Sequence, residues 1–234
     1  MLRHRVLRGA VTAGRVASLG RRLTAEGVGT AALLTAVVGS GIMGERLAGG
    51  NVGIALLANS ISTGAALVVL ILMFAPISGA HFNPIVSAVS ASRGELSWGS
   101  AAAYGAVQIA GALAGVVCAH VMFGEPLMAW STHERSGLAQ IFSEAVATFG
   151  LLLVILTCAR HQPSRVAYAV GAYIASAYWF AASTSFANPA VTLARSVTNT
   201  FAGIRPNDVA AFLVAQVIGA TGAALLSRWL VPPE

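Results

Sequence analysis

Long apolar segments alternate with short polar, glycine-rich or proline-rich breaks along almost the whole chain. A helix that crosses a bilayer needs about 20 mostly apolar residues. The pattern predicts six such spans, at residues 24–44, 52–75, 98–123, 138–159, 165–183 and 208–231. No polar stretch after residue 23 is long enough to form a separate soluble domain. We therefore predict an all-α membrane protein with six transmembrane helices in one domain over residues 24–231.

Two shorter helical segments interrupt this pattern, one after the second span and one after the fifth. They cover residues 83–92 and 188–199, and each begins with an Asn-Pro pair. The two motifs read Asn83-Pro84-Ile85 and Asn188-Pro189-Ala190. Asn is favoured at a helix N-cap and Pro at the first helical position, so each pair is a strong helix-start signal. Because both segments are too short to cross, we predict two re-entrant half-helices that end near the middle of the membrane.

Other residues recur in the same order in the two halves of the chain. Glu26 in the first span matches Glu144 in the fourth, and Gln108 in the third span matches Gln216 in the sixth. We interpret residues 24–123 and 138–231 as two repeats. Each repeat has an odd number of spans, so the second must be inverted relative to the first, and the half-helices enter from opposite faces.

The charged residues indicate how the chain lies in the membrane. Only 9% of the residues are charged, against about a quarter in soluble domains. All basic residues are Arg, and six of them precede the first span within a basic tail, residues 1–23. This placement follows the positive-inside rule and predicts cytoplasmic N- and C-termini. It also argues against nucleic acid as the partner of this basic chain, and predicts membrane lipid instead.

Two facing half-helix N-termini favour the passage of neutral solutes. Each presents unpaired backbone N–H groups and about half a positive charge, which repels cations. The amides of Asn83 and Asn188 can donate hydrogen bonds, and the extended backbone before each half-helix is tolerable only if it lines a watery path. Donors at the centre and carbonyl acceptors along the wall suit water or a polyol.

Glu26 and Glu144 are ionisable residues inside apolar spans, which makes them candidates for function. One interpretation is a proton relay. The other is that each carboxylate accepts N–H bonds from a re-entrant loop and anchors it. Their pairing by the repeat favours anchoring. No spacing of His, Cys or acidic residues suggests a metal site, and no nucleophile–base pair within the spans suggests an intramembrane enzyme.

With both Asn-Pro motifs, both Glu and both Gln, residues 24–231 resemble the major intrinsic protein family, the aquaporins and aquaglyceroporins. The resemblance implies a channel domain without cofactor, metal or catalysis, assembled as a homotetramer with one pore per subunit. It also implies a narrow outer filter of four positions, which the family's spacing, carried over without gaps, places at Thr63, Ser176, Ser185 and Val191. Water-selective members have an aromatic residue, a His and an Arg there. Four small residues imply a wider neck.

Three residues near the motifs depart from the family's pattern or extend it. Val191 occupies the position of the family's Arg, whereas Arg195 lies one turn further along the same face of the half-helix. Arg195 either lines the outer vestibule or pairs with lipid or a loop at the interface. His81 is expected to line the inner pore. Ile85, where the family has Ala, either narrows the midplane or packs aside.

The stretches around residues 185–196 and 200–206 resemble a bacterial branch associated with arsenical resistance. The resemblance implies a channel in the bacterial inner membrane for small neutral solutes: glycerol-like polyols, undissociated arsenite and some water. One alternative is a mainly water-conducting pore. Another, from a different class, is an ion-coupled secondary transporter, for which Glu26 and Glu144 would be the only candidates for ion coupling.

Overall fold

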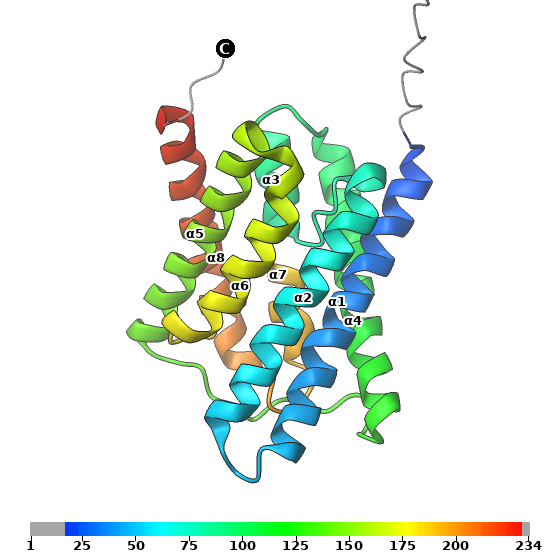
Figure 1. The fold of residues 1–234 in the computed structure, drawn as a ribbon, viewed down its shortest axis with the longest axis vertical. Helices are drawn as coiled ribbons and strands as arrows, with labels where there is room; N and C mark the ends of the chain where they lie inside the picture. Colours follow the sequence, from blue (N-terminus) through cyan, green and yellow to red (C-terminus); the bar gives the residue numbers. More distant parts are fainter. Residues whose placement is uncertain (1–16, 231–234) are drawn as a thin grey trace, which may run out of the picture.

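The computed structural model describes residues 17–230, and nearly all of them are helical or connect helices (Figure 1). The elements in chain order are α1 Leu19–Leu47, α2 Val52–Ser78, α3 Pro84–Ser92, α4 Trp98–Phe123, α5 Leu138–His161, the 3-10 turn η1 Pro163–Arg165, α6 Val166–Phe180, α7 Pro189–Arg195 and α8 Pro206–Leu230. The prediction of an all-α membrane fold is confirmed.

The predicted boundaries are close, with three differences. Helix α1 begins at Leu19, so the end of the predicted basic tail is helical, while residues 1–16 lie outside the described part. Five helices, α1, α2, α4, α5 and α8, are long and apolar enough to cross a membrane. Helix α6 has only 15 residues because the chain becomes extended after Phe180, and α7 ends at Arg195 rather than at residue 199.

The two predicted repeats correspond to α1–α4 and α5–α8. In each, the first helix packs extensively against the last, α1 on α4 and α5 on α8. These helices approach closely at matching positions: a Cβ at Gly111 would collide with the carbonyl oxygen of Gly27, and one at Gly219 with that of Ala145. Small residues allow such approach of membrane helices, which explains why Gly follows both Gln108 and Gln216 by three residues.

The half-helices lie between the repeats and point in from opposite ends. In Figure 1, α3 lies toward the end of the molecule where both chain termini emerge, and α7 lies toward the other end. Helix α3 packs on α8 as well as on α4, and α7 packs on α4 as well as on α8. The half-helices therefore connect the two repeats through contacts at the centre.

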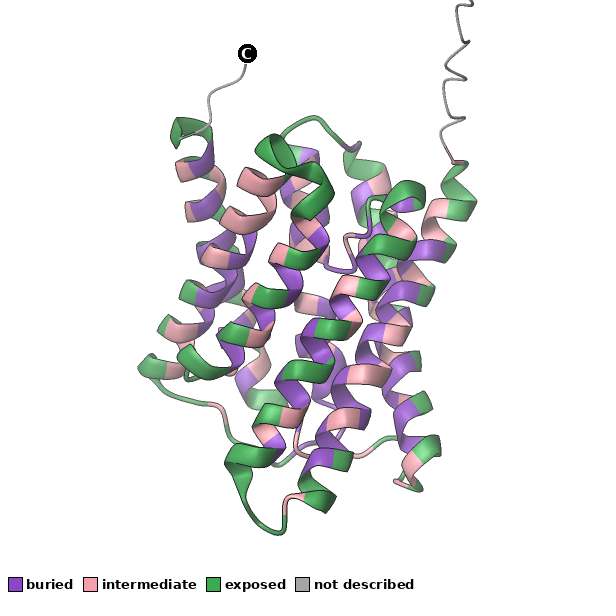
Figure 2. Ribbon diagram, in the orientation of Figure 1, coloured by how far each residue is buried: buried purple, intermediate pink, exposed green. Residues whose placement is uncertain are grey.

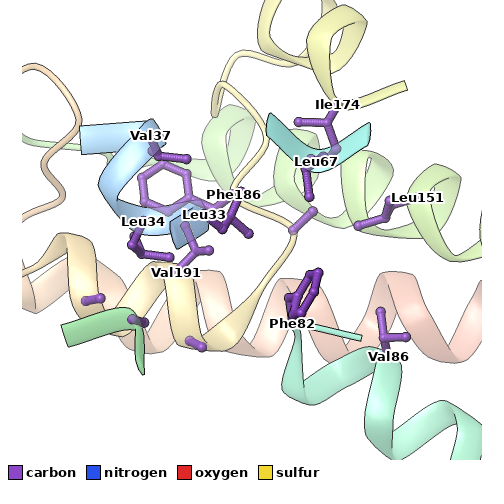
Figure 3. Close-up of a cluster of buried hydrophobic side chains, with 14 of the residues drawn as sticks. Leu33, Leu34, Val37, Leu67, Phe82, Val86, Leu151, Ile174, Phe186 and Val191 are labelled. Carbon is purple, nitrogen blue, oxygen red and sulfur yellow. The ribbon is translucent and has the colours of Figure 1, made fainter. Parts of the chain in front are cut away.

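Apolar side chains are exposed on the outward faces of the long helices (Figure 2). Examples are Ile61 and Met73 on α2 and Ile218 and Leu225 on α8. Such a belt needs lipid around it, since soluble monomers rarely expose large apolar patches. The interior is a cluster that includes Phe82 and Phe186, each from the extended segment before a half-helix (Figure 3).

The close contact of α1 with α4 predicts that Gly111→Ala destabilises the protein. The added methyl would meet the Gly27 carbonyl, and overpacking of this kind costs about 1–3 kcal/mol. Gly105→Ala on the same helix is the matched control, because its Cβ would meet only Pro84, at 3.8 Å. Thermal unfolding in detergent should show a lower Tm for Gly111→Ala alone; equal Tm values would contradict the prediction.

Candidate functional site

The two Asn-Pro motifs meet at the centre of the molecule and are hydrogen-bonded to each other's loop. Asn83 Nδ2 donates to the carbonyl of Ala187 at 2.8 Å, and Asn188 Nδ2 donates to the carbonyl of Phe82 at 2.8 Å. Each Asn Oδ1 accepts the backbone N–H of its own half-helix, from Ile85 at 3.0 Å and from Ala190 at 3.0 Å. Each amide therefore uses one hydrogen on the opposite loop and has one left.

The segments before the half-helices have an unusual backbone. Five residues other than glycine have positive φ: Ala80, Phe82, Thr184, Ser185 and Ala187. Left-handed conformations cost such residues about 1 kcal/mol or more each. Residues with positive φ are interspersed with residues with negative φ, so that successive peptide groups point in different directions and some N–H groups point into the protein. These segments therefore need external partners to hold them.

Glu26 is the partner of the first segment. Its two carboxylate oxygens accept the backbone N–H groups of His81 at 2.9 Å and Phe82 at 2.7 Å, and the hydroxyl of Ser78 at 2.6 Å. Gln108 Nε2 donates to the same carboxylate at 2.8 Å. Glu26 is fully buried.

Glu144 makes the equivalent contacts in the second repeat. Its oxygens accept the backbone N–H groups of Phe186 at 3.1 Å and Ala187 at 2.5 Å, and Gln216 Nε2 donates to it at 2.8 Å. Gln216 also donates to Thr192 of α7 at 2.8 Å. Both carboxylates thus bind backbone N–H groups, and neither lines the cavity described next.

A cavity of about 680 Å³ passes the meeting point of the two motifs. Its lining includes Arg93 and Glu95 toward the end with the chain termini, Asn83 and Asn188 at the centre, and Arg195 toward the other end. His81 also lines it, with Nδ1 3.0 Å from the hydroxyl of Ser87 and the ring against Tyr104.

Four other motif residues lie beside the pore rather than on it. Pro84, Ile85, Pro189 and Ala190 are absent from the described lining of the cavity. Ile85 packs against the apolar cluster instead. Of the two open interpretations of Ile85, its position therefore favours packing aside over narrowing the midplane.

Three of the four predicted filter residues line the cavity, and one does not. Thr63, Ser185 and Val191 are buried and line it, whereas Ser176 is exposed on the outside of α6. Five residues of α6 line the cavity: Val166, Ala167, Val170, Ile174 and Tyr178, of which Ile174 and Tyr178 flank Ser176 in the sequence. These two share a face because they are four residues apart, and Ser176, two residues from each, points the opposite way.

The placement of Ser176 in the filter is therefore corrected: the α6 residue in contact with Thr63 is Tyr178, with the two hydroxyl oxygens 3.2 Å apart. The carry-over without gaps does not account for the register of α6, which turns Ile174 and Tyr178 toward the cavity and Ser176 away from it.

Arg195 is inside the protein rather than at the lipid interface. It is 2% exposed, lines the cavity, and donates from Nε to the carbonyl of Ala202. Its guanidinium lies over the ring of Phe186, with Cζ 3.5 Å from the ring centroid. The geometry thus favours the vestibule interpretation.

Arg135 is a site residue that sequence reasoning missed. It lies in the connection between α4 and α5, and its Cζ is 5.0 Å from the centroid of the same Phe186 ring. Its Nε donates to Gly203 at 2.8 Å, and its Nη1 lies 3.3 Å from the carbonyl of Ser183. Burial lowers the pKa of Arg135. Only the fold brings Arg135 against Phe186, which lines the cavity, so no local signal could have identified it.

The comparisons with known proteins agree with this architecture. The family model for the major intrinsic protein matches residues 14–165 and 157–234. The chain belongs to the major intrinsic protein family. It is 53% identical over 215 residues to the aquaglyceroporin AqpS of Rhizobium meliloti (strain 1021), covering 92% of both chains. It is 28% identical to aquaporin NIP6-1 of Arabidopsis thaliana, over 93% of this chain and 71% of that protein.

A solved structure shows the same fold. The aquaglyceroporin from Plasmodium falciparum superimposes with a TM-score of 0.71 at 24% identity, covering 91% of this chain and 95% of that one. The family match and the similarity to an aquaglyceroporin make the chain a multi-pass membrane channel for small neutral solutes and not an enzyme. Among residues 17–230, no group of three or more His, Cys, Asp or Glu could hold a metal ion.

The contacts of Glu144 predict that Glu144→Gln weakens the fold and the pore together. An amide presents N–H groups where the second segment already donates, leaving at least one buried donor unpaired, at a cost of about 1–3 kcal/mol. Glu45→Gln, on the exposed last turn of α1, is the control. The Tm of thermal unfolding and the solute flux in proteoliposomes should both be lower for Glu144→Gln only. A variant with an unchanged Tm and full flux would refute the anchoring role.

Proposed function

We propose that this chain is a passive channel for glycerol-like polyols and undissociated arsenite, with some water flow. The observation that carries the proposal is the position after the second motif, where Val191 lines the cavity and no side chain larger than Val projects from the first turn of α7. Thr63 and Ser185 line the same cavity, and Tyr178 is in contact with Thr63. The similarity of this chain to an aquaglyceroporin supports a pore wider than that of a water-selective channel.

The centre of the pore favours neutral hydrogen-bonding solutes. Asn83 and Asn188 each have one amide hydrogen left to donate to a solute oxygen. The two half-helices direct their N-termini toward this point, and their dipoles oppose the passage of cations. A polyol or an undissociated hydroxide can replace hydrogen bonds to water with hydrogen bonds to these two amides. It carries no charge, so the half-helix dipoles do not oppose its passage.

Arg195 adds a fixed positive charge at the outer neck. Val191 cannot provide it, but the Arg195 guanidinium reaches the same cavity from one turn further along α7. Phe186 and the Ala202 carbonyl fix its position. We therefore assign cation exclusion to the half-helix dipoles and Arg195 together, and solute width to Val191.

The distribution of Arg supports cytoplasmic termini in a bacterial inner membrane. The end of the molecule with both termini has Arg21, Arg22, Arg93, Arg160, Arg165 and Arg228. The other end has four, Arg46, Arg135, Arg195 and Arg205, of which Arg46 is paired with Glu125 at 2.8 Å and Arg205 with Asp208 at 3.0 Å. Lipid surrounds the apolar belt in this proposal, and four copies assemble with one pore each, as the family resemblance implies.

Two alternatives make different predictions. A mainly water-conducting pore would exclude glycerol and arsenite. A secondary transporter would show saturable, gradient-coupled uptake, yet Glu26 and Glu144 are both engaged by backbone N–H groups, which leaves the coupling ion no free carboxylate in the spans. The passive channel fits the contacts best.

Stopped-flow light scattering on proteoliposomes tests the proposal directly. Wild-type protein should speed the entry of glycerol, arsenite and water over empty liposomes. Val191→Arg should reduce glycerol flux by tenfold or more while water flux falls less, because a long cationic side chain narrows the neck. Val191→Ala is the control: it keeps a small apolar side chain at this position and should retain glycerol flux. Fast water flow with no glycerol or arsenite flux in the wild type would overturn the proposal.

The position of Arg195 predicts a charge-dependent cation barrier. Arg195→Gln should raise proton or sodium leak through proteoliposomes, whereas Arg195→Lys should keep the leak low because it keeps the positive charge. Arg46→Gln, in an exposed ion pair with Glu125, is the control. Unchanged leak in correctly folded Arg195→Gln would show that the half-helix dipoles suffice.

A further inference from the structure

Arg22, in the first turn of α1, uses only part of its hydrogen-bonding capacity inside the protein. Its Nε donates to the hydroxyl oxygen of Tyr104 at 2.7 Å, and its Cζ lies 5.2 Å from the centroid of that ring. Within residues 17–230, its two terminal nitrogens have neither a hydrogen-bond partner nor an acidic partner. We propose that Arg22, together with the exposed Arg21, binds the phosphate of an anionic lipid headgroup, and that this lipid supports the pore through Tyr104.

The proposed site lies near the level of the lipid headgroups. Helix α1 begins at the end of the molecule where both chain termini emerge (Figure 1). Trp98 at the start of α4 and Trp229 near the end of α8 are 64% and 78% exposed at the same end. Tryptophan is enriched where the membrane meets water. Tyr104 follows Trp98 by six residues, about 9 Å of helix, so the contact between Arg22 and Tyr104 is within two turns of that level.

The charge around the start of α1 suits an anionic partner. The first turn of α1 has no acidic residue, and Arg21 is exposed beside Arg22. The sequence before residue 17 adds four Arg and neither Asp nor Glu; the four are Arg3, Arg5, Arg8 and Arg15. Clusters of about four to eight basic residues next to a transmembrane helix attract anionic lipids. The planar guanidinium also matches the oxygens of a phosphate group, which it binds through two parallel N–H groups.

Other Arg residues at this end already have partners within the protein. Arg93 is paired with Glu95 at 2.8 Å, and Arg228 donates to the carbonyl of Ser92 at 3.3 Å. The donors left over at the start of α1 therefore distinguish this position from those two. Arg22 and Tyr104 are also absent from the lining of the pore cavity, so a lipid there would not compete with a passing solute.

A short chain of hydrogen bonds connects Arg22 to the pore. Tyr104 is fully buried and donates its hydroxyl to the carbonyl of Ser78 at 2.9 Å. Ser78 is the last residue of α2, and its own hydroxyl donates to Glu26, which anchors the first extended segment. The ring of Tyr104 also lies against His81, which lines the cavity. A lipid phosphate that fixes Arg22 thereby restricts Tyr104 and the pore wall behind it.

The first extended segment benefits from this support because its backbone is strained. Ala80 and Phe82 have positive φ, which is costly for residues other than glycine. When the Tyr104 oxygen accepts a hydrogen bond from the Arg22 cation, its own O–H becomes a stronger donor to Ser78. A bound phosphate keeps the guanidinium in place, and the segment should therefore hold its conducting geometry more often with anionic lipid present.

Lipid binding is measured by native mass spectrometry of the full-length protein in a neutral detergent. Phosphatidylglycerol should bind about tenfold more tightly than phosphatidylcholine, which has the same phosphate but no net charge. Arg22→Gln should lower the affinity for phosphatidylglycerol about tenfold, because charge-assisted bonds to the phosphate are lost. Arg165→Gln removes one exposed charge at the same end of the molecule and is the control, with a clearly smaller loss. A large excess of inorganic phosphate should not displace the lipid.

Reconstitution measures the effect on the pore. Glycerol carries no charge, so its flux does not respond directly to the charge of the membrane surface. Wild-type flux should be about fivefold higher in liposomes with phosphatidylglycerol than in pure phosphatidylcholine, the low end of typical coupling between two sites. Arg22→Gln should show no such difference. Tyr104→Phe keeps both Arg residues and should still bind the lipid, but lose the difference, whereas Tyr168→Phe, exposed on α6, should keep it.

Each outcome decides one step. Equal affinity in wild type and Arg22→Gln, or equal losses in Arg22→Gln and Arg165→Gln, overturns the lipid site. Displacement by inorganic phosphate overturns lipid as the ligand. Selective binding with the same flux in both liposomes overturns the coupling, as does a lipid-dependent flux in Tyr104→Phe; if that variant does not fold, the flux of Arg22→Gln decides.

The lipid site does not depend on the solutes proposed above. A wild-type protein that binds phosphatidylglycerol selectively but passes no polyol in either liposome overturns the proposed function and leaves the site intact. The coupling is then measured by water flux in the same liposomes. Conversely, glycerol flux without selective lipid binding overturns the site and leaves the proposed function intact.

Discussion

The rest of the pore depends on how the protein satisfies the backbone of two extended segments at membrane depth. Lipid offers no hydrogen bonds, so peptide groups outside helices must be bonded to protein or to water in a cavity. Here Glu26 and Glu144 accept the inward N–H groups, which also stabilises five non-glycine residues at positive φ. The carbonyls of Phe82 and Ala187 in turn accept from Asn188 and Asn83. Without these carboxylates the segments would have neither partners nor a fixed shape.

The same arrangement makes the two repeats depend on each other. Asn83 and Asn188 each cap their own half-helix and donate to the extended segment of the other repeat. Gln108 and Gln216 connect each Glu to a hydroxyl on the half-helix. The width of the midplane is therefore set jointly, and a change in either loop is transmitted to the other. This dependence explains why a duplicated sequence keeps the same polar residues in both copies.

We propose that specificity in this chain is determined farther out, where the repeats differ. The neck combines Thr63, Tyr178 and Ser185 with the apolar Val191, and Arg195 enters from the second turn of α7. The guanidiniums of Arg195 and Arg135 both contact the ring of Phe186, which joins the neck to the connection between α4 and α5. A single Arg directly after the motif would control both the charge and the width of the neck. Here we assign the charge to Arg195 and the width to Val191.

Local signals in the sequence determined the spans, the half-helix starts and the inverted repeat, because hydropathy, Asn-Pro capping and matched polar residues act within a few turns. The filter positions follow from the family resemblance and not from these local signals; Thr63, Ser185 and Val191 line the cavity, whereas Ser176 is exposed on α6. Only the tertiary structure decided that Tyr178 faces the pore, that Arg195 is buried against Phe186, and that Arg135 reaches the same ring. These contacts join segments far apart in the chain, and their geometry follows from packing rather than from any local preference.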